Sequence, residues 1–187
     1  MKKLIYLFLF AFIASSAFMS CDDDEPSSPF KTVMLGAQEN TTIDGFYSIN
    51  LDKTYTLVEA AANQATIDLF CYYDGDKNKM TLTSPGANIA GVFTGDNAPE
   101  NWEIQDTTYF HQLESTVLSV EQFDALTAVS PIETYYSEVD PKRKAKELAV
   151  DDLYAFITED NYYGIFKVVS VIEGATGSVE FKYIIKK

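Results

Sequence analysis

The sequence contains a single histidine, His111, and this scarcity excludes most catalytic and metal-binding sites. A zinc site built on two or three histidines cannot form. A Ser-His-Asp triad would have to use His111, but no serine stands in a Gly-x-Ser-x-Gly motif. His111 is therefore interpreted as a strand-end or loop residue. The sequence predicts no catalytic residue, no metal ligand and no cofactor, and the protein is expected not to be an enzyme.

Cysteine is almost as rare, with only Cys21 and Cys71. If Cys21 is modified, Cys71 is the only remaining thiol and no intramolecular disulfide can form. Cys71 lies in an apolar run, where cysteine usually behaves as a small buried hydrophobe. The core must therefore be built from apolar side chains, and 13 Phe and 12 Tyr supply large ones.

Basic residues are outnumbered, with 14 Lys and Arg against 28 Asp and Glu. Such a charge repels phosphate backbones, which excludes nucleic acid as a partner. It also repels an anionic membrane surface. Membrane attachment is therefore expected to come from a lipid and not from the folded domain.

No apolar run is long enough to span a bilayer, which takes about 20 residues. The longest run, Leu4–Phe18, follows two lysines and precedes the small residue Ser20. A basic start, a short apolar segment and small residues before a cleavage site are typical of a secretory signal. Residues 1–20 are predicted to be a signal peptide.

The residue after this segment, Cys21, makes the signal resemble that of a bacterial lipoprotein, in which the cysteine is acylated and becomes the new N-terminus. Phe18-Met19-Ser20 departs from the usual residues before such a cysteine, although Ser20 is small. The acidic run Asp22, Asp23, Asp24 and Glu25 resembles the export signal of Bacteroidota lipoproteins that face outward. The resemblance implies an outer-membrane protein facing outward. The alternatives are the periplasmic face, or an ordinary cleaved signal with an incidental cysteine.

The remaining chain divides into an acidic tether, 21–29, and one domain, 30–187. Removal of the signal leaves 167 residues (187 less 20), a usual size for one domain. Loss of the two signal lysines leaves 12 basic against 28 acidic side chains, a formal charge of −16. The tether has too little apolar surface to fold.

Within the domain, short runs of β-branched and aromatic residues separated by turn residues predict a mainly β fold, an antiparallel sheet or sandwich with two or three short helices. Helices are predicted from capping residues at Thr56 and Ser119, and a third by Asp140-Pro141 ahead of a basic run that is either a solvated helix face or a loop. A long irregular loop is expected over 85–100, followed by extended chain from 102 to 110. Strands are predicted over 31–35, 46–51, 65–73, 79–83, 153–158, 163–171 and 178–185.

Two acidic groupings are candidate sites of chemistry. Asp74, Asp76 and Asn78 match the first three ligand positions of a calcium loop, but lysine and proline stand where glycine and glutamate are required. A hairpin turn explains these three residues equally well. The pair Asp151-Asp152 is too ordinary in so acidic a chain to indicate a glycosidase.

Aromatic side chains give the remaining signal for binding. Tyrosine doublets occur at 72–73, 135–136 and 162–163. Neighbouring residues of a strand face opposite sides, so one tyrosine of each doublet is expected at the surface, where it could stack on a sugar or contact a partner. The candidates are Tyr73, Tyr136 and Tyr163, with Trp102 beside the long loop as the strongest anchor. Ordinary cross-strand packing is the alternative.

Two further segments resemble known families. Gly45–Ser48, Thr54–Thr56, Glu59-Ala60, Asn63-Gln64 and Ile67–Leu69 together resemble an uncharacterised lipoprotein domain of gut Bacteroidota. The segments 153–156, 163–164 and 177–179 are similar to the closing strands of HmuY-like haem-binding lipoproteins, which are β-rich. That family holds haem with two histidines, so its ligand set does not carry over to a chain with His111 alone.

The sequence thus favours a cell-surface lipoprotein acting as a non-enzymatic binding module with a glycan or protein partner. The main alternative is a glycan-binding accessory protein of a polysaccharide uptake system, which exposure of Trp102 and the tyrosines on one face would favour. Haem binding and hydrolysis are minor alternatives. A hydrolase would need polar groups converging around His111 or paired carboxylates in a cleft.

Overall fold

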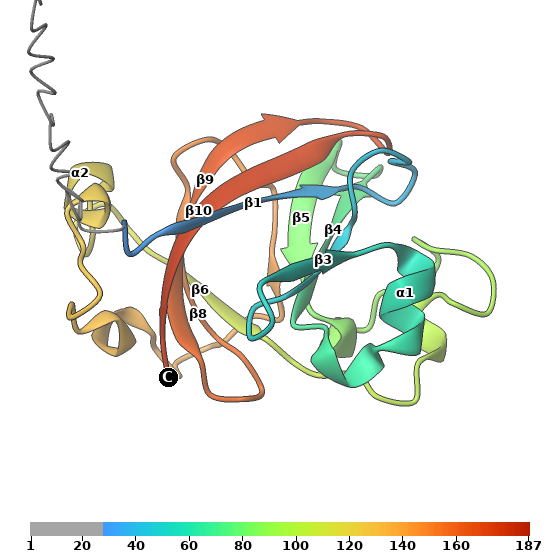
Figure 1. Ribbon diagram of the computed structural model, residues 1–187. Coiled ribbons are helices and arrows are strands. Elements are labelled where there is room, and N and C mark those ends of the chain that lie inside the picture. The colour runs from blue at the N-terminus through green and yellow to red at the C-terminus, as the bar shows by residue number, and fades with distance from the viewer. Residues whose placement is uncertain (1–27) are drawn as a thin grey trace, which may run out of the picture.

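The computed structural model describes residues 28–187, which form two five-stranded antiparallel sheets packed face to face (Figure 1). Sheet A has the strand order β1 (Lys31–Gly36), β10 (Ser178–Lys186), β9 (Tyr163–Ile172), β8 (Leu153–Ile157) and β6 (Tyr109–Gln112). Sheet B has the order β3 (Lys53–Tyr55), β2 (Phe46–Ser48), β4 (Leu69–Asp74), β5 (Lys79–Thr83) and β7 (Lys144–Ala145). The predicted mainly β, sandwich-like fold is confirmed.

The central core lies between the two sheets and follows from the alternation of side chains along each strand. On β4, Leu69 and Cys71 face this core, while Phe70 faces the other way. On β9, Phe166 and Val168 contribute from sheet A. Cys71 is fully buried, and this burial raises the pKa of its thiol, as expected for a structural cysteine.

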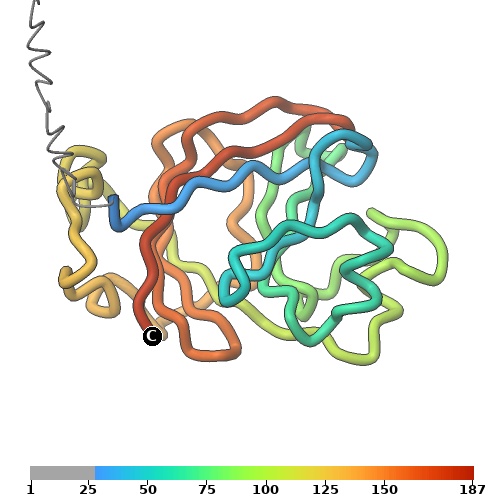
Figure 2. Tube along the Cα trace, in the orientation of Figure 1, coloured from blue at the N-terminus to red at the C-terminus, as the bar shows by residue number. Residues whose placement is uncertain are grey.

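The outer face of sheet B is also covered. Helix α1 (Leu57–Ala62) and the irregular segment 85–102 lie over it, at the right of the chain trace in Figure 2. Phe46 and Phe70 from the strands meet Phe93 and Trp102 from the segment, with ring centroids of neighbouring pairs 5.0 to 5.7 Å apart. This aromatic cluster fixes a long segment that contains only two short 3₁₀ helices, Pro85–Ala87 and Pro99–Asn101.

The outer face of sheet A carries a third cluster at the opposite end of the molecule (Figure 2). Helix α2 (Val120–Asp124) and the 3₁₀ helix Ile132–Tyr135 lie over Leu153, Ile165 and Ile184. Both sheets therefore bury apolar side chains on their two faces, which accounts for the many Phe and Tyr residues in a small domain.

The predicted caps are confirmed. Thr56 accepts a hydrogen bond from the Glu59 N–H at the start of α1, and Ser119 accepts one from the Gln122 N–H at the start of α2. In both helices the side chain of the third residue, Glu59 or Gln122, accepts a hydrogen bond from the backbone N–H of the cap residue, which completes a capping box. Asn63 ends α1.

The β4–β5 hairpin and the closing meander of β8, β9 and β10 are confirmed as well. At the hairpin turn, the Asp74 carboxylate accepts hydrogen bonds from the backbone N–H groups of Asp76 and Lys77, and Asn78 has a positive φ of 53°. These residues are engaged in the turn, in keeping with the hairpin interpretation.

Several predicted boundaries are wrong. The strand expected over 46–51 ends at Ser48, because the chain turns there and enters β3, which was not predicted. The strand expected over 65–73 begins only at Leu69, after the 3₁₀ helix Gln64–Thr66. Residues 102–105 form no strand, and β6 begins at Tyr109.

The third predicted helix, over 140–147, is also wrong. Asp140 has a φ of +54°, which is incompatible with the helical start expected of an N-cap. The chain then pairs with Phe110 through Lys142 and with β5 through β7, so its backbone hydrogen bonds are made to neighbouring strands. This segment joins the free edge of sheet A to the free edge of sheet B.

The predicted signal 1–20, Cys21 and the acidic residues 22–25 lie outside the described residues. Among residues 28–187, no helix has both the length and the apolar character that crossing a bilayer requires.

Candidate functional site

The strongest predicted binding residue, Trp102, is not at the surface. Its side chain is only 5% exposed and belongs to the aromatic cluster over sheet B. The indole N–H donates a 2.8 Å hydrogen bond to the carbonyl of Asn97 within the same segment. The expectation of an exposed Trp102 ring is therefore wrong: the ring is buried against the apolar outer face of sheet B.

The three predicted tyrosines are half-buried and do not form one surface. Tyr73 contacts the central core, and its hydroxyl hydrogen-bonds to Asn78 on the hairpin turn. Tyr136 and Tyr163 meet edge to face with ring centroids 6.1 Å apart over sheet A. Cross-strand and inter-element packing, the alternative given above, accounts for most of their contacts.

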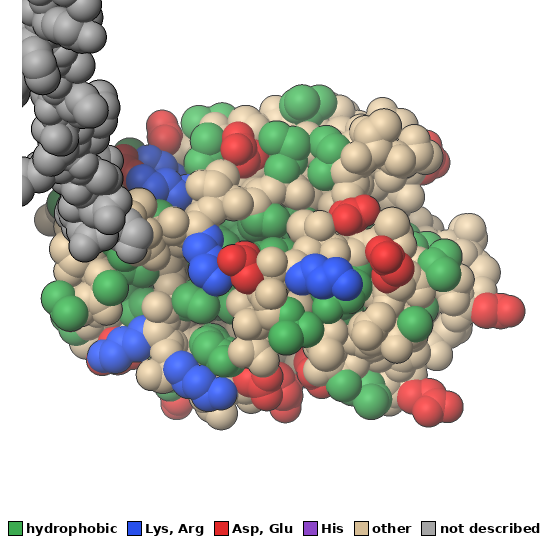
Figure 3. Space-filling view, in the orientation of Figure 1, with side chains coloured by type: hydrophobic (Ala, Val, Ile, Leu, Met, Phe, Trp, Pro, Cys, Tyr) green, Lys and Arg blue, Asp and Glu red, His purple; other side chains and the backbone are tan. Residues whose placement is uncertain are grey.

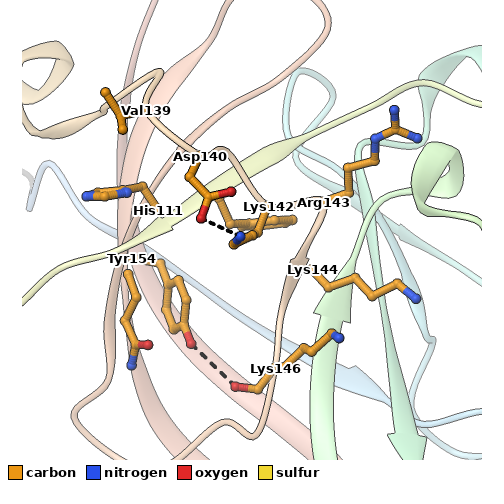
Figure 4. Close-up of a pocket in the computed structure, with 10 residues that line it drawn as sticks. His111, Val139, Asp140, Lys142, Arg143, Lys144, Lys146 and Tyr154 are labelled. Carbon is orange, nitrogen blue, oxygen red and sulfur yellow. Dashed lines mark hydrogen bonds and ion pairs between the residues drawn. The ribbon is translucent and has the colours of Figure 1, made fainter.

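A pocket of about 640 Å³ opens where the edge of sheet A meets the edge of sheet B (Figure 4). We call it the seam pocket. It is lined by Phe110, His111 and Gln112 of β6, by Tyr154 of β8, and by Val139, Asp140, Lys142, Arg143, Lys144 and Lys146 of the segment leading into and out of β7. Four of its ten residues are lysine or arginine, in a chain with a formal charge of −14.

Strand alternation places these cations. Ala145 is fully buried in the central core, so its neighbours Lys144 and Lys146 project from the opposite side of the strand. Figure 4 shows these two lysines running side by side in the same direction. The apolar anchor at one position thus determines where the charges on either side point.

The remaining contacts hold the pocket wall in place. The Arg143 guanidinium donates a 2.8 Å hydrogen bond to the carbonyl of Gly86. The Tyr154 hydroxyl donates to the carbonyl of Lys146 over 3.4 Å (Figure 4). Backbone bonds between Phe110 and Lys142, of 2.6 and 3.1 Å, tie the segment to β6.

Most of the basic side chains of the seam pocket have no acidic partner among the described residues. Among the described residues, Lys142 alone of the four basic side chains has an ion pair, with Asp140 at 2.6 Å. Burial and the nearby positive charge of Lys146 lower the pKa of Lys144, and Asp74 opposes this shift. An anion bound in the pocket would offset this repulsion between lysines and favour their charged forms.

On the face shown in Figure 3, basic and acidic side chains are scattered among hydrophobic ones, with no basic patch. The seam pocket is a local concentration of positive charge in an acidic chain. The sequence contains the signal, because residues 142–147 hold four of the twelve basic residues expected in the mature chain, but a basic run by itself predicts only a solvated helix face or loop.

His111 lies on β6 and lines the seam pocket, although no serine or cysteine lines it. Cys71 is buried in the central core instead. Within the described residues, no group of three or more His, Cys, Asp or Glu side chains is placed to hold a metal ion. The chemistry that the pocket supports best is electrostatic binding of an anion.

A second cavity, of about 610 Å³, borders the first. Lys144 lines both. The second cavity is otherwise uncharged or acidic, and the irregular loop forms one wall. Its lining is Gln38, Glu39, Tyr72, Tyr73, Asp74, Gly75, Asp76, Asn88, Ile89, Ala90, Gly91, Val92, Thr94 and Lys144. We call it the hairpin cavity.

The sequence matches no protein-family model and no curated protein. The fold is similar to the crystal structure of a DUF4466 family protein from Parabacteroides merdae, with a TM-score of 0.55 and 13% sequence identity. The match covers 85% of this chain and 55% of the other, so this chain spans about half the length of that protein. At this identity the likeness concerns the fold. Its source is in keeping with the resemblance to an uncharacterised Bacteroidota domain.

Proposed function

We propose that this protein is a non-enzymatic binding module, held at the outer membrane by a lipid on Cys21 and facing outward, that captures an anionic ligand in the seam pocket. The observation that carries the proposal is the gathering of four basic side chains in one concavity of an acidic protein, three of them without an ion pair among the described residues. A cationic pocket in an acidic protein favours ligands whose negative groups can reach the basic side chains of the pocket and disfavours ligands that place negative charge elsewhere on the protein.

The membrane part of the proposal is supported by the sequence. The basic and apolar start, Cys21 and the acidic run Asp22–Glu25 resemble an exported Bacteroidota lipoprotein signal. The fold likeness to a protein from Parabacteroides merdae supports the same bacterial group. The likeness of β8, β9 and β10 to HmuY-like lipoproteins belongs to this proposal without haem coordination by a histidine pair.

The binding part is tested with dextran sulfate, an immobilised polyanion without a defined sequence. The fragment 25–187 is expected to bind it at low salt, and the double variant Lys144→Gln, Lys146→Gln to bind at least about tenfold more weakly, since a hydrogen bond to a charged group contributes about 1.5–3 kcal/mol.

The matched control is Lys53→Gln, Lys187→Gln, which changes the net charge equally at exposed positions that do not line the seam pocket. Lys53 lies on β3, at the opposite edge of sheet B from β7. Equal weakening by both double variants would mean that only net charge matters, and the seam pocket would lose its role.

A glycan-binding accessory protein remains the second candidate, favoured by the half-buried pair Tyr136 and Tyr163 over sheet A. Aromatic rings at a surface bind neutral sugars by stacking, which salt hardly weakens. Binding of a neutral oligosaccharide that is lost in Tyr163→Ala and kept in Lys144→Gln, Lys146→Gln would favour this candidate.

A further inference from the structure

We infer that the ligand is an acidic polysaccharide in which charged and neutral sugars alternate, and that it lies across Lys144 from the seam pocket into the hairpin cavity. The inference rests on the proposed function, because it names the class of ligand for the same pocket. Three features of the described residues carry it: the close spacing of the cations, the sharing of Lys144 by the two cavities, and the change of charge between the cavities.

The cations lie close together on one short segment. Lys142, Lys144 and Lys146 occupy every second position of it, although only Lys144 and Ala145 form strand β7 and Arg143 lies at a bend. A fully extended chain rises about 3.3 Å per residue, so the first and last Cα atoms are at most roughly 13 Å apart. A small ion such as sulfate can reach one or two of these side chains. A ligand that uses all of them must carry several anionic groups along its length.

Lys144 connects the seam pocket with the hairpin cavity. Lys144 lines both cavities, which have similar volumes of about 640 and 610 Å³. On the far side, the hairpin turn and the loop residues 88–94 form the walls. A chain-like ligand placed along the lysines would therefore leave the seam pocket beside Lys144 and meet these walls next.

The hairpin cavity has the opposite electrostatic character. Asp74, Asp76 and Glu39 line it, together with the amides of Gln38 and Asn88. A polymer that is charged on every unit would place anionic groups beside these carboxylates, which is unfavourable. A neutral sugar instead presents hydroxyl groups that donate hydrogen bonds to carboxylate and amide oxygens. Alternation of charged and neutral sugars satisfies both cavities.

One aromatic side chain is suitably placed for a neutral sugar. Tyr73 lines the hairpin cavity and is half-buried, with its hydroxyl held by Asn78. A fixed aromatic ring can pack against the apolar face of a sugar ring at little entropic cost. A poly-acidic peptide has no flat apolar face that could pack on this ring, so the lining of the hairpin cavity favours a carbohydrate.

The experiment compares four probes by titration calorimetry on the fragment 25–187 at one low salt concentration. They are a hyaluronan hexasaccharide, in which glucuronate and N-acetylglucosamine alternate, a hexagalacturonate that is charged on every unit, a short poly-L-glutamate, and neutral cellohexaose. We expect the alternating hexasaccharide to bind at least about tenfold more tightly than each of the other probes, because a single additional hydrogen bond to a charged group accounts for a difference of this size.

The variant Asp76→Lys tests the hairpin cavity directly. Asp76 is exposed on the turn, and the carboxylate of Asp74, not its own, accepts the turn hydrogen bonds, so the fold is expected to tolerate the change. We expect the variant to lose affinity for the alternating hexasaccharide and to gain affinity for hexagalacturonate. The matched control is Asp96→Lys, an equal change of charge on an exposed loop residue that lines neither cavity.

The outcomes separate this inference from the proposed function. If no anionic probe binds, both fail. Equal affinity for all polyanions would leave the seam pocket its role and refute the alternating polysaccharide. The same conclusion follows if Asp76→Lys behaves like Asp96→Lys while the double variant Lys144→Gln, Lys146→Gln abolishes binding. Tightest binding of poly-L-glutamate would replace the polysaccharide with an acidic protein segment.

Discussion

At the residue scale, the buried polar groups are those in which a small change has the largest expected effect. Asp68, immediately before β4, is only 9% exposed, and its carboxylate accepts a 2.7 Å hydrogen bond from the Ile49 N–H. Burial raises its pKa to about 6, against the opposing effect of that hydrogen bond. Desolvation is the larger effect because one backbone donor does not replace the hydration of a full charge.

This pKa makes stability depend on pH. Between the ordinary value of 3.8 and about 6, the folded state holds the Asp68 proton more tightly than the unfolded state. The contribution of Asp68 to the free energy of unfolding is therefore greatest below pH 4 and decreases as pH rises to 6. We predict that Asp68→Asn removes this decrease. The free energy of unfolding, measured with urea, should then change by about 2–3 kcal/mol less between pH 4 and 6 in the variant than in the native protein. Parallel stability curves for the two proteins would contradict the assignment.

At the scale of elements, the irregular segment 85–102 functions as a cover for sheet B. Its apolar side chains, among them Ile89, Phe93 and Trp102, enter the aromatic cluster on that sheet. The remaining residues form turns and contribute a wall to the hairpin cavity. A long loop between strands is therefore fixed at one surface by packing and available at the other for contact.

Trp102→Ala is predicted to cost about 3–5 kcal/mol of unfolding free energy, because it leaves a cavity among the rings and an unpaired carbonyl at Asn97. Trp102→Phe should cost less, since it keeps most of the apolar volume. The measurement is urea unfolding of the fragment 25–187. A loss of ligand affinity without a loss of stability would instead indicate a binding role for Trp102.

Gly164 on β9 gives a second prediction at this scale. An added Cβ would enter the Phe156 ring, which packs directly over the glycine from β8. Gly164→Ala is therefore expected to destabilise the protein by about 1–3 kcal/mol through overpacking. Gly91→Ala is not a fair comparison, because the φ of Gly91 is +74°, so the control is Gly75→Ala on the exposed hairpin turn, measured by the shift in melting temperature.

At the scale of the whole molecule, the negative charge and the basic seam pocket together determine how the protein meets its surroundings. The formal charge of −14 is expected to repel an anionic membrane or nucleic acid at long range. Binding in the seam pocket should weaken steeply with salt, because exposed charges are screened over about 8 Å at physiological ionic strength.

Membrane attachment is predicted to depend on one side chain. Cys21→Ser in the full chain should move the protein from the membrane fraction to the soluble fraction, since the acidic domain has no other means of attachment in the proposal. The measurement is fractionation with immunodetection in the native host. A Cys71→Ser variant is the matched control and should leave the distribution unchanged. A membrane-bound Cys21→Ser protein would refute the lipid anchor.

Elements whose identity is set locally could be predicted from the sequence. Thr56 and Ser119 cap helices because the residues that complete each capping box lie within three positions. The hairpin turn at Asp74 and the closing meander follow from local turn residues and from alternation along the chain. Such patterns need no information about distant segments.

The tertiary structure decided which apolar residues became buried and where the site lies. Trp102 is covered only because sheet B has a second apolar face, and the run Lys142–Lys146 forms a bridge to β6 and the two-residue strand β7 because the edges of β6 and β5 offer hydrogen-bond partners. Composition determined the charge and the absence of most catalytic templates, and the pattern of short β-branched and aromatic runs between turn residues determined the β-rich class. The seam pocket depends on contacts between residues more than 30 positions apart, and no local pattern in the chain specifies these.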